Sequence, residues 1–582
     1  MTTNFSYKLR WTEGDSMDFT VLFFFTAAIA IYIVIVMISR AKRNAEYRQQ
    51  IRSSWGKKPQ QKIKQDDFES IACYYRNKAK IDNHAFSIDD ITWDDLDMNR
   101  VFERINSTST VIGEEYLYNL LRELTFDGAE LAKRQQLIEL FQKNPDKREQ
   151  LQLQFAKMGK QRFLSIFEYL NGNRSTYRKS AALYYVLLVI FLISPVITIF
   201  TPIGGILFLA SLLTNVGVYF KTRNEIVGHL ESLSYIIGMA NIARKAARVD
   251  FPEIQYYLDV LKVSTSSIKG MSFNAFFSIF YTTENYFLEM IKVIFLGEPI
   301  AFYSLFKLLK KHSKELTQIY EVVGYLDGLI AIASYRESIG SYCLPDLTLG
   351  ARNISFKNLR HPLIDNCVEN SLSTQKSIII TGSNASGKST FLKTLAINAV
   401  FAQTICTCHA DSYSSGYFKV YSSMALKDNL EMKESYYIVE IKSLKRILEA
   451  FDDETPCLCI IDEVLRGTNT IERIAASSEI INCFANANCI CICATHDLEL
   501  TRILDGAVGN YHFQEYFSQN EIKFDYKLYD GPSNTKNAIN LLKILGYSEK
   551  IVTNASRRAQ RFEAEGYWDK IYIYIQHMNF HT

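Results

Sequence analysis

Residues 377–390, with the sequence SIIITGSNASGKST, decide the fold of the C-terminal region of this chain. They fit the pattern GxxxxGK[ST] between an apolar run and FLKTLA (391–396), and this order predicts a strand, a glycine-rich turn and a helix. Gly382 and Gly387 permit the positive φ at which successive N–H groups point toward phosphate oxygens, and the helix N-terminus adds its dipole. The pattern assigns Lys388 to the β- and γ-phosphates of a nucleotide and the Ser389 hydroxyl to Mg²⁺. The predicted ATP-binding residues of this segment are Gly382, Asn384, Gly387, Lys388, Ser389 and Thr390.

Two further apolar runs end in residues that suit the same site. Residues 457–463, CLCIIDE, predict a buried strand that ends in two acids, which is typical of a Walker B element. At the carboxyl edge of a parallel sheet, Asp462 would hold Mg²⁺ through water, and Glu463 is the candidate base for the attacking water. A lone histidine is usually structural. His496, however, follows the apolar run 489–495, which we expect to form a strand beside 457–462, and this placement favours a contact of His496 with the γ-phosphate.

The length and hydropathy of the chain indicate the number of domains and the candidate membrane spans. A chain of 582 residues predicts two to four domains, and a net charge of +3 indicates no nucleic-acid partner without a local basic patch. Residues 19–39 carry no charge over 21 positions, which is enough for a helix to cross a bilayer. Acids precede this run, and Arg40, Lys42 and Arg43 follow it. The positive-inside rule therefore predicts an outside N-terminus and cytoplasmic soluble domains.

A second charge-free run, residues 180–220, spans 41 positions and is long enough for two passes that turn near TPIGG (201–205). Cations flank both ends, so both ends are predicted to be cytoplasmic. The alternative is a helical pair buried in a large soluble core. A third apolar stretch, residues 276–296, contains three charged residues and predicts a packed or interfacial helix.

The remaining pattern divides into a helical region and an α/β region. Helical periodicity covers residues 93–155 and resumes over 225–341, which predicts one all-α domain with the hairpin inserted into it. After Pro345, short apolar strands alternate with helices, which is typical of a mostly parallel sheet. The polar linker 40–67 is either a lipid-facing basic segment or a solvated one. The cysteines alternate with aliphatic residues as in buried strands, and Cys406-Thr407-Cys408-His409 has no second pair that would complete a metal site.

These motifs, in this order, resemble those of the MutS-type mismatch-repair ATPases. The family's phosphate loop TGPNMGGKST compares with residues 381–390, its DExxRGT[ST] with DEVLRGTN (462–469), and its [AT]TH with ATH (494–496). Weaker similarities cover RHPLI (360–364), AQ (402–403), residues 434–440, FDYKLYDG (524–531), residues 538–546, residues 109–118 and residues 327–345. The resemblance covers about residues 93–560, apart from the hairpin and a stretch near 240–310.

The departures from the family pattern matter as well. Ser383, Ala385 and Ser386 replace Pro, Met and Gly in the loop but leave Lys388 and the phosphate-binding glycines in place. Glu472-Arg473 replaces the family's Asp-Gly, and Tyr437 replaces the signature Phe. No room is left for the mismatch-reading and connector domains, so mismatch discrimination is expected to be weak or absent. The sequence FQE (513–515) fits the family's mismatch wedge FxE, but it lies inside the ATPase pattern and predicts a strand.

The resemblance implies a homodimer with a composite ATP site, to which Ser435 contributes from the opposite subunit, so the predicted catalytic residues are Glu463, His496 and Ser435. One interpretation is a membrane-anchored ATPase that also contacts DNA. The other is a membrane-tethered switch that moves an unknown protein partner. A transporter is disfavoured, because no LSGGQ sequence is present and three spans make a poor substrate pathway.

The predicted fold is therefore α/β plus all-α, with an N-terminal transmembrane helix, a helical lever or core domain that contains a transmembrane hairpin, and a P-loop (ABC-type) ATPase domain. The predicted divisions are an extracytoplasmic N-terminus (1–18), a transmembrane helix (19–39), a juxtamembrane linker (40–90), a first helical lever or core segment (91–179), a transmembrane hairpin (180–220), a second helical lever or core segment (221–344), the ATPase domain (345–560) and a C-terminal tail (561–582).

Overall fold

The computed structural model describes residues 15–60, 62–81, 86–160, 166–170, 181–268, 286–383, 385–424, 436–452, 454–466, 468–518, 521–533, 538–568 and 570. The chain forms two compact units, each assembled from three segments. The helical unit contains residues 1–81, 105–119 and 136–338. The α/β unit contains residues 82–104, 120–135 and 339–582.

The helical unit is built around one long buried helix. Its helices are α1 (Asp15–Ser54), α2 (Gln65–Ile71), α3 (Cys73–Ile81), α8 (Pro145–Ala156), α9 (Ile166–Leu170), α10 (Ala182–Phe200), α11 (Ile203–Ala246), η1 (Pro252–Ile254), α12 (Gln255–Ser267), α14 (Tyr286–Ile294), α15 (Gly297–Lys311) and α16 (Ser313–Ile339), while α6 (Val111–Arg122) and α7 (Gly128–Lys143) contribute to both units. Ile319, Val323 and Ile330 of α16 are at most 1% exposed, so this helix forms the core of the unit.

A buried carboxylate of α16 fixes the start of α6. Asp327 accepts hydrogen bonds from the backbone N–H of Ser109 and Thr110, at 3.0 and 2.9 Å, and from the Thr110 hydroxyl at 2.7 Å. These N–H groups precede α6 and have no partner within the helix, so the carboxylate acts as a cap supplied from another helix. A Cβ on Gly113 would lie 2.3 Å from Asp327 Oδ2, which explains the glycine one turn further on.

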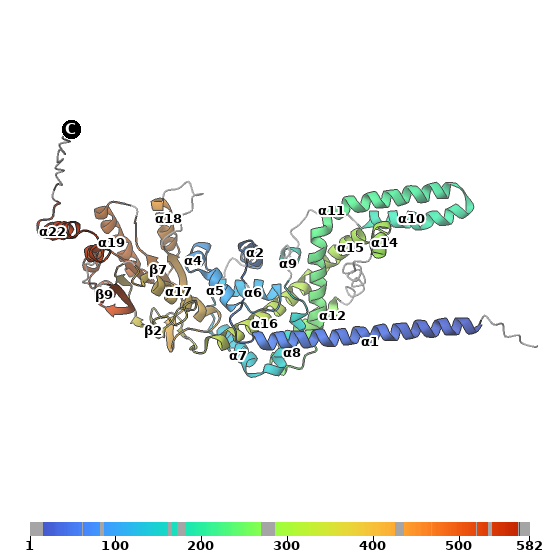
Figure 1. Cartoon of the computed structure of the whole chain (residues 1–582), viewed down its shortest axis with the longest axis horizontal. Helices are drawn as coiled ribbons and strands as arrows, with labels where there is room; N and C mark the ends of the chain where they lie inside the picture. Colours follow the sequence, from blue (N-terminus) through green and yellow to red (C-terminus); the bar gives the residue numbers. More distant parts are fainter. Residues whose placement is uncertain are drawn as a thin grey trace, which may run out of the picture. The chain divides into compact units, whose positions relative to one another are not determined.

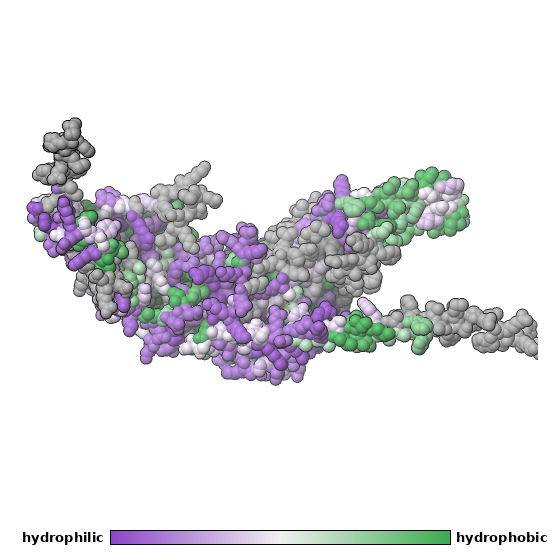
Figure 2. Space-filling view, viewed as in Figure 1, coloured by the Kyte–Doolittle hydropathy of each residue, from purple (hydrophilic) through white to green (hydrophobic). Residues whose placement is uncertain are grey.

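The helices α10 and α11 form an antiparallel pair whose turn, at Thr201-Pro202, confirms the predicted break in the apolar run 180–220. Both helices are long and apolar enough to cross a membrane, and only 17% and 22% of their apolar windows are buried. The third helix with this property among the described residues, α16, is 72% buried within the protein. In α1, large apolar side chains between Phe23 and Ile38 are likewise exposed. Figure 2 shows apolar surface along α10, the adjoining part of α11 and a portion of α1, and Figure 1 labels these helices.

The α/β unit contains two sheets, which confirms the predicted class of α/β plus all-α. The larger has the strand order β10-β9-β4-β8-β7-β6, in which every neighbouring pair is parallel except β10 with β9. The smaller has the order β1-β5-β2-β3. The strands are β1 (Asp346–Thr348), β2 (Ile354–Leu359), β3 (Asn370–Thr374), β4 (Ile378–Thr381), β5 (Ser412–Gly416), β6 (Lys419–Ser423), β7 (Cys457–Asp462), β8 (Cys489–Thr495), β9 (Gly509–Ser518) and β10 (Glu521–Asp530).

Helices of the α/β unit connect and cover these strands. They are α4 (Asp90–Asp95), α5 (Met98–Ile105), α17 (Lys388–Thr404), α18 (Tyr436–Glu449), α19 (Thr470–Asn486), α20 (Leu498–Ile503), α21 (Ala538–Ile544) and α22 (Glu549–Glu565). The cysteines of β7 and β8 are at most 1% exposed, as predicted for buried strands. The sequence FQE (513–515) lies within β9, which confirms its prediction as a strand.

Residues 82–104 belong to the α/β unit, although the predicted boundaries placed residues 91–104 with the helical domain. The reason is a set of polar contacts to the end of β6. Asp95 accepts a bond from the Ser422 hydroxyl at 2.6 Å, and the Thr92 hydroxyl accepts the Ser422 N–H at 3.1 Å. Asp89 also pairs with Arg446 of α18 at 2.7 Å. The two units are therefore interleaved along the sequence.

Candidate functional site

The site begins where β4 ends and α17 starts. Residues 382–387, here called the glycine loop, connect these two elements. Gly382 has φ 147° and Gly387 has φ 103°, which confirms the predicted need for positive φ. A Cβ on Gly382 would lie 2.7 Å from the Phe513 carbonyl oxygen, and a Cβ on Gly387 would lie 3.1 Å from the Tyr526 ring. The backbone conformation therefore favours glycine at both positions, and at Gly382 the nearby backbone oxygen leaves no space for a side chain.

Lys388 is folded back onto this loop. Its Nζ donates to the carbonyl oxygens of Gly382 and Ser383, at 2.7 and 2.9 Å, and lies 3.5 Å from His496 Nε2. Burial lowers the pKa of Lys388 to about 8, although Asp462 and Glu463 oppose that shift. The ammonium group is thus largely desolvated, which strengthens its attraction for any anion that enters the loop.

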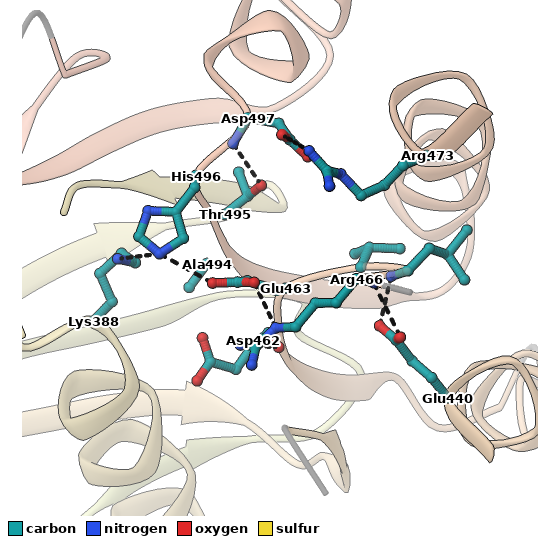
Figure 3. Close-up of polar contacts among 12 residues, drawn as sticks. Lys388, Glu440, Asp462, Glu463, Arg466, Arg473, Ala494, Thr495, His496 and Asp497 are labelled. Carbon is teal, nitrogen blue, oxygen red and sulfur yellow. Dashed lines mark hydrogen bonds and ion pairs between the residues drawn. The ribbon is translucent and has the colours of Figure 1, made fainter. Parts of the chain in front are cut away.

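Glu463 and His496 lie side by side at the carboxyl edge of the larger sheet (Figure 3). The parallel strands β7 and β8 are neighbours, with Asp462 opposite Ala494, which confirms the predicted strand pairing. His496 Nε2 lies 3.0 Å from Glu463 Oε1, and Arg466 Nε lies 2.5 Å from Glu463 Oε2. Burial would raise the pKa of Glu463, but the hydrogen bond from His496 and the charge of Arg466 lower it overall. The carboxylate is therefore held ionised, as a base requires.

These residues line one cavity of about 840 Å³. Ser389 and Thr390 of the first turn of α17 line it together with Asp462, Glu463 and His496. Residues in and near β2, β3 and β10 supply another portion of the lining, which includes His361, Ile364, Cys367, Val368, Asn370 and Tyr526. The volume lies within the range of about 300–1,000 Å³ that is typical of small-molecule and cofactor sites. A glycine cradle, a desolvated lysine and two adjacent carboxylates fit a Mg²⁺-nucleotide.

Two predicted residues, Asn384 and Ser435, lie outside the described residues. The structure adds residues that the sequence pattern did not assign to the site. Glu440 of α18 accepts the backbone N–H of Leu465 at 2.5 Å and of Arg466 at 3.1 Å, and so supports the turn after Glu463. The only sequence signal for Glu440 was its place at the end of the signature segment 434–440.

A second supporting contact lies beside His496. Arg473 of α19 binds both oxygens of Asp497, at 2.6 and 3.0 Å, and Asp497 directly follows the histidine. A bidentate guanidinium–carboxylate pair fixes orientation as well as distance. At the position of Arg473 the family pattern has Gly, so this contact depends on a residue in which the chain differs from the pattern.

Comparison with known proteins gives the family. Residues 378–563 match the family model described as MutS domain V. The DNA mismatch repair protein MutS of Methanosarcina barkeri is 26% identical over 354 residues, which are 56% of this chain and 39% of that protein. Msh3 of Dictyostelium discoideum is 26% identical over 56% of this chain and 23% of its own length. MutS of Pseudothermotoga lettingae is 29% identical over 41% of this chain and 30% of its own length.

The chain thus spans less than half of the length of these curated relatives. The matched region includes the glycine loop and the ends of β7 and β8, so the similarity falls on the elements that form the cavity. By sequence, residues 378–563 are a MutS-family domain V, and the chain is similar to MutS and Msh3 proteins over up to 56% of its length.

Proposed function

We propose that this chain is a membrane-anchored ATPase that binds Mg²⁺-ATP in the cavity around Lys388 and hydrolyses it. The observation that carries the proposal is the convergence of Lys388, Glu463 and His496 at one sheet edge. His496 Nε2 lies 3.5 Å from Lys388 Nζ and 3.0 Å from Glu463 Oε1. Three chain segments meet there, and each contributes a group suited to phosphate chemistry.

Each side chain has a role in that reaction. Lys388 exchanges the carbonyl oxygens of Gly382 and Ser383 for phosphate oxygens when nucleotide enters the loop. Ser389 and Asp462 are the residues that would hold Mg²⁺, and the ion would neutralise phosphate charge when nucleotide is bound. Glu463 accepts a proton from the attacking water as the new P–O bond forms and ADP leaves. His496 would orient Glu463 and contact the γ-phosphate.

Membrane anchoring is the second element of the proposal. The helix α10 has 19 residues, and at about 1.5 Å per residue its length of roughly 28 Å matches a hydrocarbon core of about 30 Å. The apolar side chains along it include Leu183, Val186 and Ile193, and all three are at least 49% exposed. Exposed apolar surface of this extent is costly in water and is favourable in lipid. We infer that α1 and the α10–α11 pair enter the bilayer, with the α/β unit in the cytoplasm.

The proposed oligomer is a homodimer in which Ser435 of each subunit completes the other subunit's site, as the family resemblance implies. DNA contact is proposed only as binding that does not depend on a mismatch. Phe513 of the sequence FQE is 1% exposed, so it cannot stack on a base as a mismatch wedge must. This burial also favours the alternative in which a tethered ATP-driven switch acts on a protein partner.

The test is ATP binding and hydrolysis by the full-length protein purified in detergent, with and without Mg²⁺. We expect hydrolysis that requires Mg²⁺ and is lost in Lys388→Ala together with nucleotide binding. A well-folded preparation that binds no ATP at up to millimolar concentration would refute the proposal.

A further inference from the structure

A side-chain contact between the glycine loop and β9 has no role in the proposed ATPase chemistry. The Ser383 hydroxyl donates to Glu515 Oε2 at 2.6 Å across 132 positions of sequence. Strand β9 pairs in parallel with β4, with Thr381 opposite His512, and it continues past the point where β4 ends. The continuation of β9 therefore runs beside the glycine loop and brings Glu515 to Ser383.

Strand β9 packs against one side of the glycine loop. Side chains alternate along a strand, so Phe513 and Glu515 lie on one face of β9. Phe513 packs edge-on against Phe391 of α17 with ring centroids 5.7 Å apart, and its carbonyl oxygen occupies the space beside Gly382. The sequence FQE thus forms a wall of the loop, with an apolar contact from Phe513 and a polar one from Glu515.

Burying the Glu515 carboxylate beside the glycine loop costs desolvation free energy. Its exposure is 8%, and a buried carboxylate is tolerated only when hydrogen bonds or cations compensate for the lost hydration. Asp462, Glu463 and Glu515 all attract Lys388 electrostatically, so Glu515 adds to a negative environment around one lysine. The family pattern has Pro at the position of Ser383, and a prolyl side chain has no hydroxyl to donate.

We propose that Glu515 is a positioning residue for the glycine loop: by holding the Ser383 side chain it fixes the backbone carbonyls that receive Lys388 Nζ and so shapes the loop for phosphate. This inference rests on the proposed nucleotide binding. Gly382 and Gly387 give the loop unusual backbone freedom, and a hydrogen bond to a charged acceptor offsets some of the entropy lost when the loop is ordered. The contact affects how tightly nucleotide binds, because no reacting atom touches Glu515.

The experiment is a double-mutant cycle in the full-length protein, with Ser383→Ala, Glu515→Ala and the double variant. The dissociation constant for a fluorescent ADP is measured in the presence of Mg²⁺, and KM and kcat are measured for ATP. A hydrogen bond to a buried charged group predicts that each single variant binds about tenfold more weakly. The double variant should bind as weakly as either single one, because both remove the same contact. KM should rise while kcat stays within about twofold.

Two further variants separate positioning from a general loss of structure. Glu515→Gln keeps an acceptor oxygen for Ser383, so it should restore affinity to within about threefold of the unmodified protein. Gln514→Ala, on the opposite face of β9, is the matched control and should leave affinity unchanged. Thermal melting of each variant checks that it is folded.

The outcomes distinguish the two proposals. Unchanged affinity in both Ser383→Ala and Glu515→Ala, or strictly additive losses in the double variant, overturns the inference and leaves the ATPase proposal standing. Absence of nucleotide binding by the unmodified protein overturns both.

Discussion

Replacing Glu463 by Gln gives the sharpest test of the proposed chemistry. The substitution keeps the shape of the side chain but removes the charge and the ability to accept a proton from water. Glu463 lies between two basic partners, with His496 at 3.0 Å and Arg466 at 2.5 Å. The amide can accept from one of them through its oxygen but presents an N–H₂ group to the other, so the histidine loses its fixed orientation.

The expected magnitude follows from what the change leaves intact. Loss of a general base lowers turnover by about 10²–10⁴-fold. The loop carbonyls that hold Lys388 are not altered, so nucleotide affinity should stay within a few fold. The Glu463 side chain is 22% exposed, and the loss of a partly solvated ion pair costs about 1 kcal/mol or less of folding stability. Glu463→Gln should therefore be folded, bind ATP and hydrolyse it very slowly.

The assay is single-turnover hydrolysis of ATP with phosphate release as the readout, alongside equilibrium nucleotide binding. Glu472→Gln is the matched control, because Glu472 is an exposed carboxylate in the first turn of α19 and outside the cavity. It should hydrolyse ATP at the unmodified rate. If Glu463→Gln also hydrolysed ATP at that rate, Glu463 would not be the base and the assignment of the β7 carboxylates would be wrong.

Three other predictions concern the helical unit, the membrane and DNA. Burial raises the pKa of Glu115 to about 8, while the hydrogen bond donated by Tyr320 opposes the shift. The folded protein therefore keeps a proton on Glu115 that the unfolded chain releases near the ordinary pKa of 4.5. The resulting contribution to the free energy of unfolding is complete below pH 4.5 and is lost as pH rises toward 8. The loss is on the order of a few kcal/mol. Glu115→Gln should flatten the fall in melting temperature between pH 5 and 8, and an unchanged slope would contradict this account. Single cysteines introduced at Lys42 and Glu472 should be protected from an impermeant thiol reagent in intact cells, and labelling of either from outside would contradict the cytoplasmic assignment. DNA binding, where detected, should fall on the order of 10³-fold between 50 and 200 mM salt if about six phosphates are contacted, with equal affinity for homoduplex and G·T mispair; a tenfold preference for the mispair at matched salt would show that another element reads mismatches.

The sequence alone determined the elements that depend on local pattern. The glycine loop, the acids at the end of β7 and the histidine after β8 each lie within a short window in which an apolar run specifies the strand. The turn between α10 and α11 was predictable for the same reason, because Thr201-Pro202 interrupts a long apolar run. The placement of His496 rested on the expectation that β8 lies beside β7, which the register of the two strands confirms.

Tertiary structure decided the contacts that join distant segments. No local pattern indicates that Glu515 meets Ser383, that Arg473 holds Asp497, or that Asp95 caps the end of β6. Each of these contacts depends on which strands are neighbours and on how far one strand extends beyond the next. Hydrophobic periodicity does not predict such contacts, because it indicates which residues are buried but not which segment packs against them. For the same reason, the periodicity of residues 93–104 predicted helix but did not indicate the unit to which the segment belongs. Hydrogen bonds from Ser422, at the end of β6, to Thr92 and Asp95 join the segment to the α/β unit.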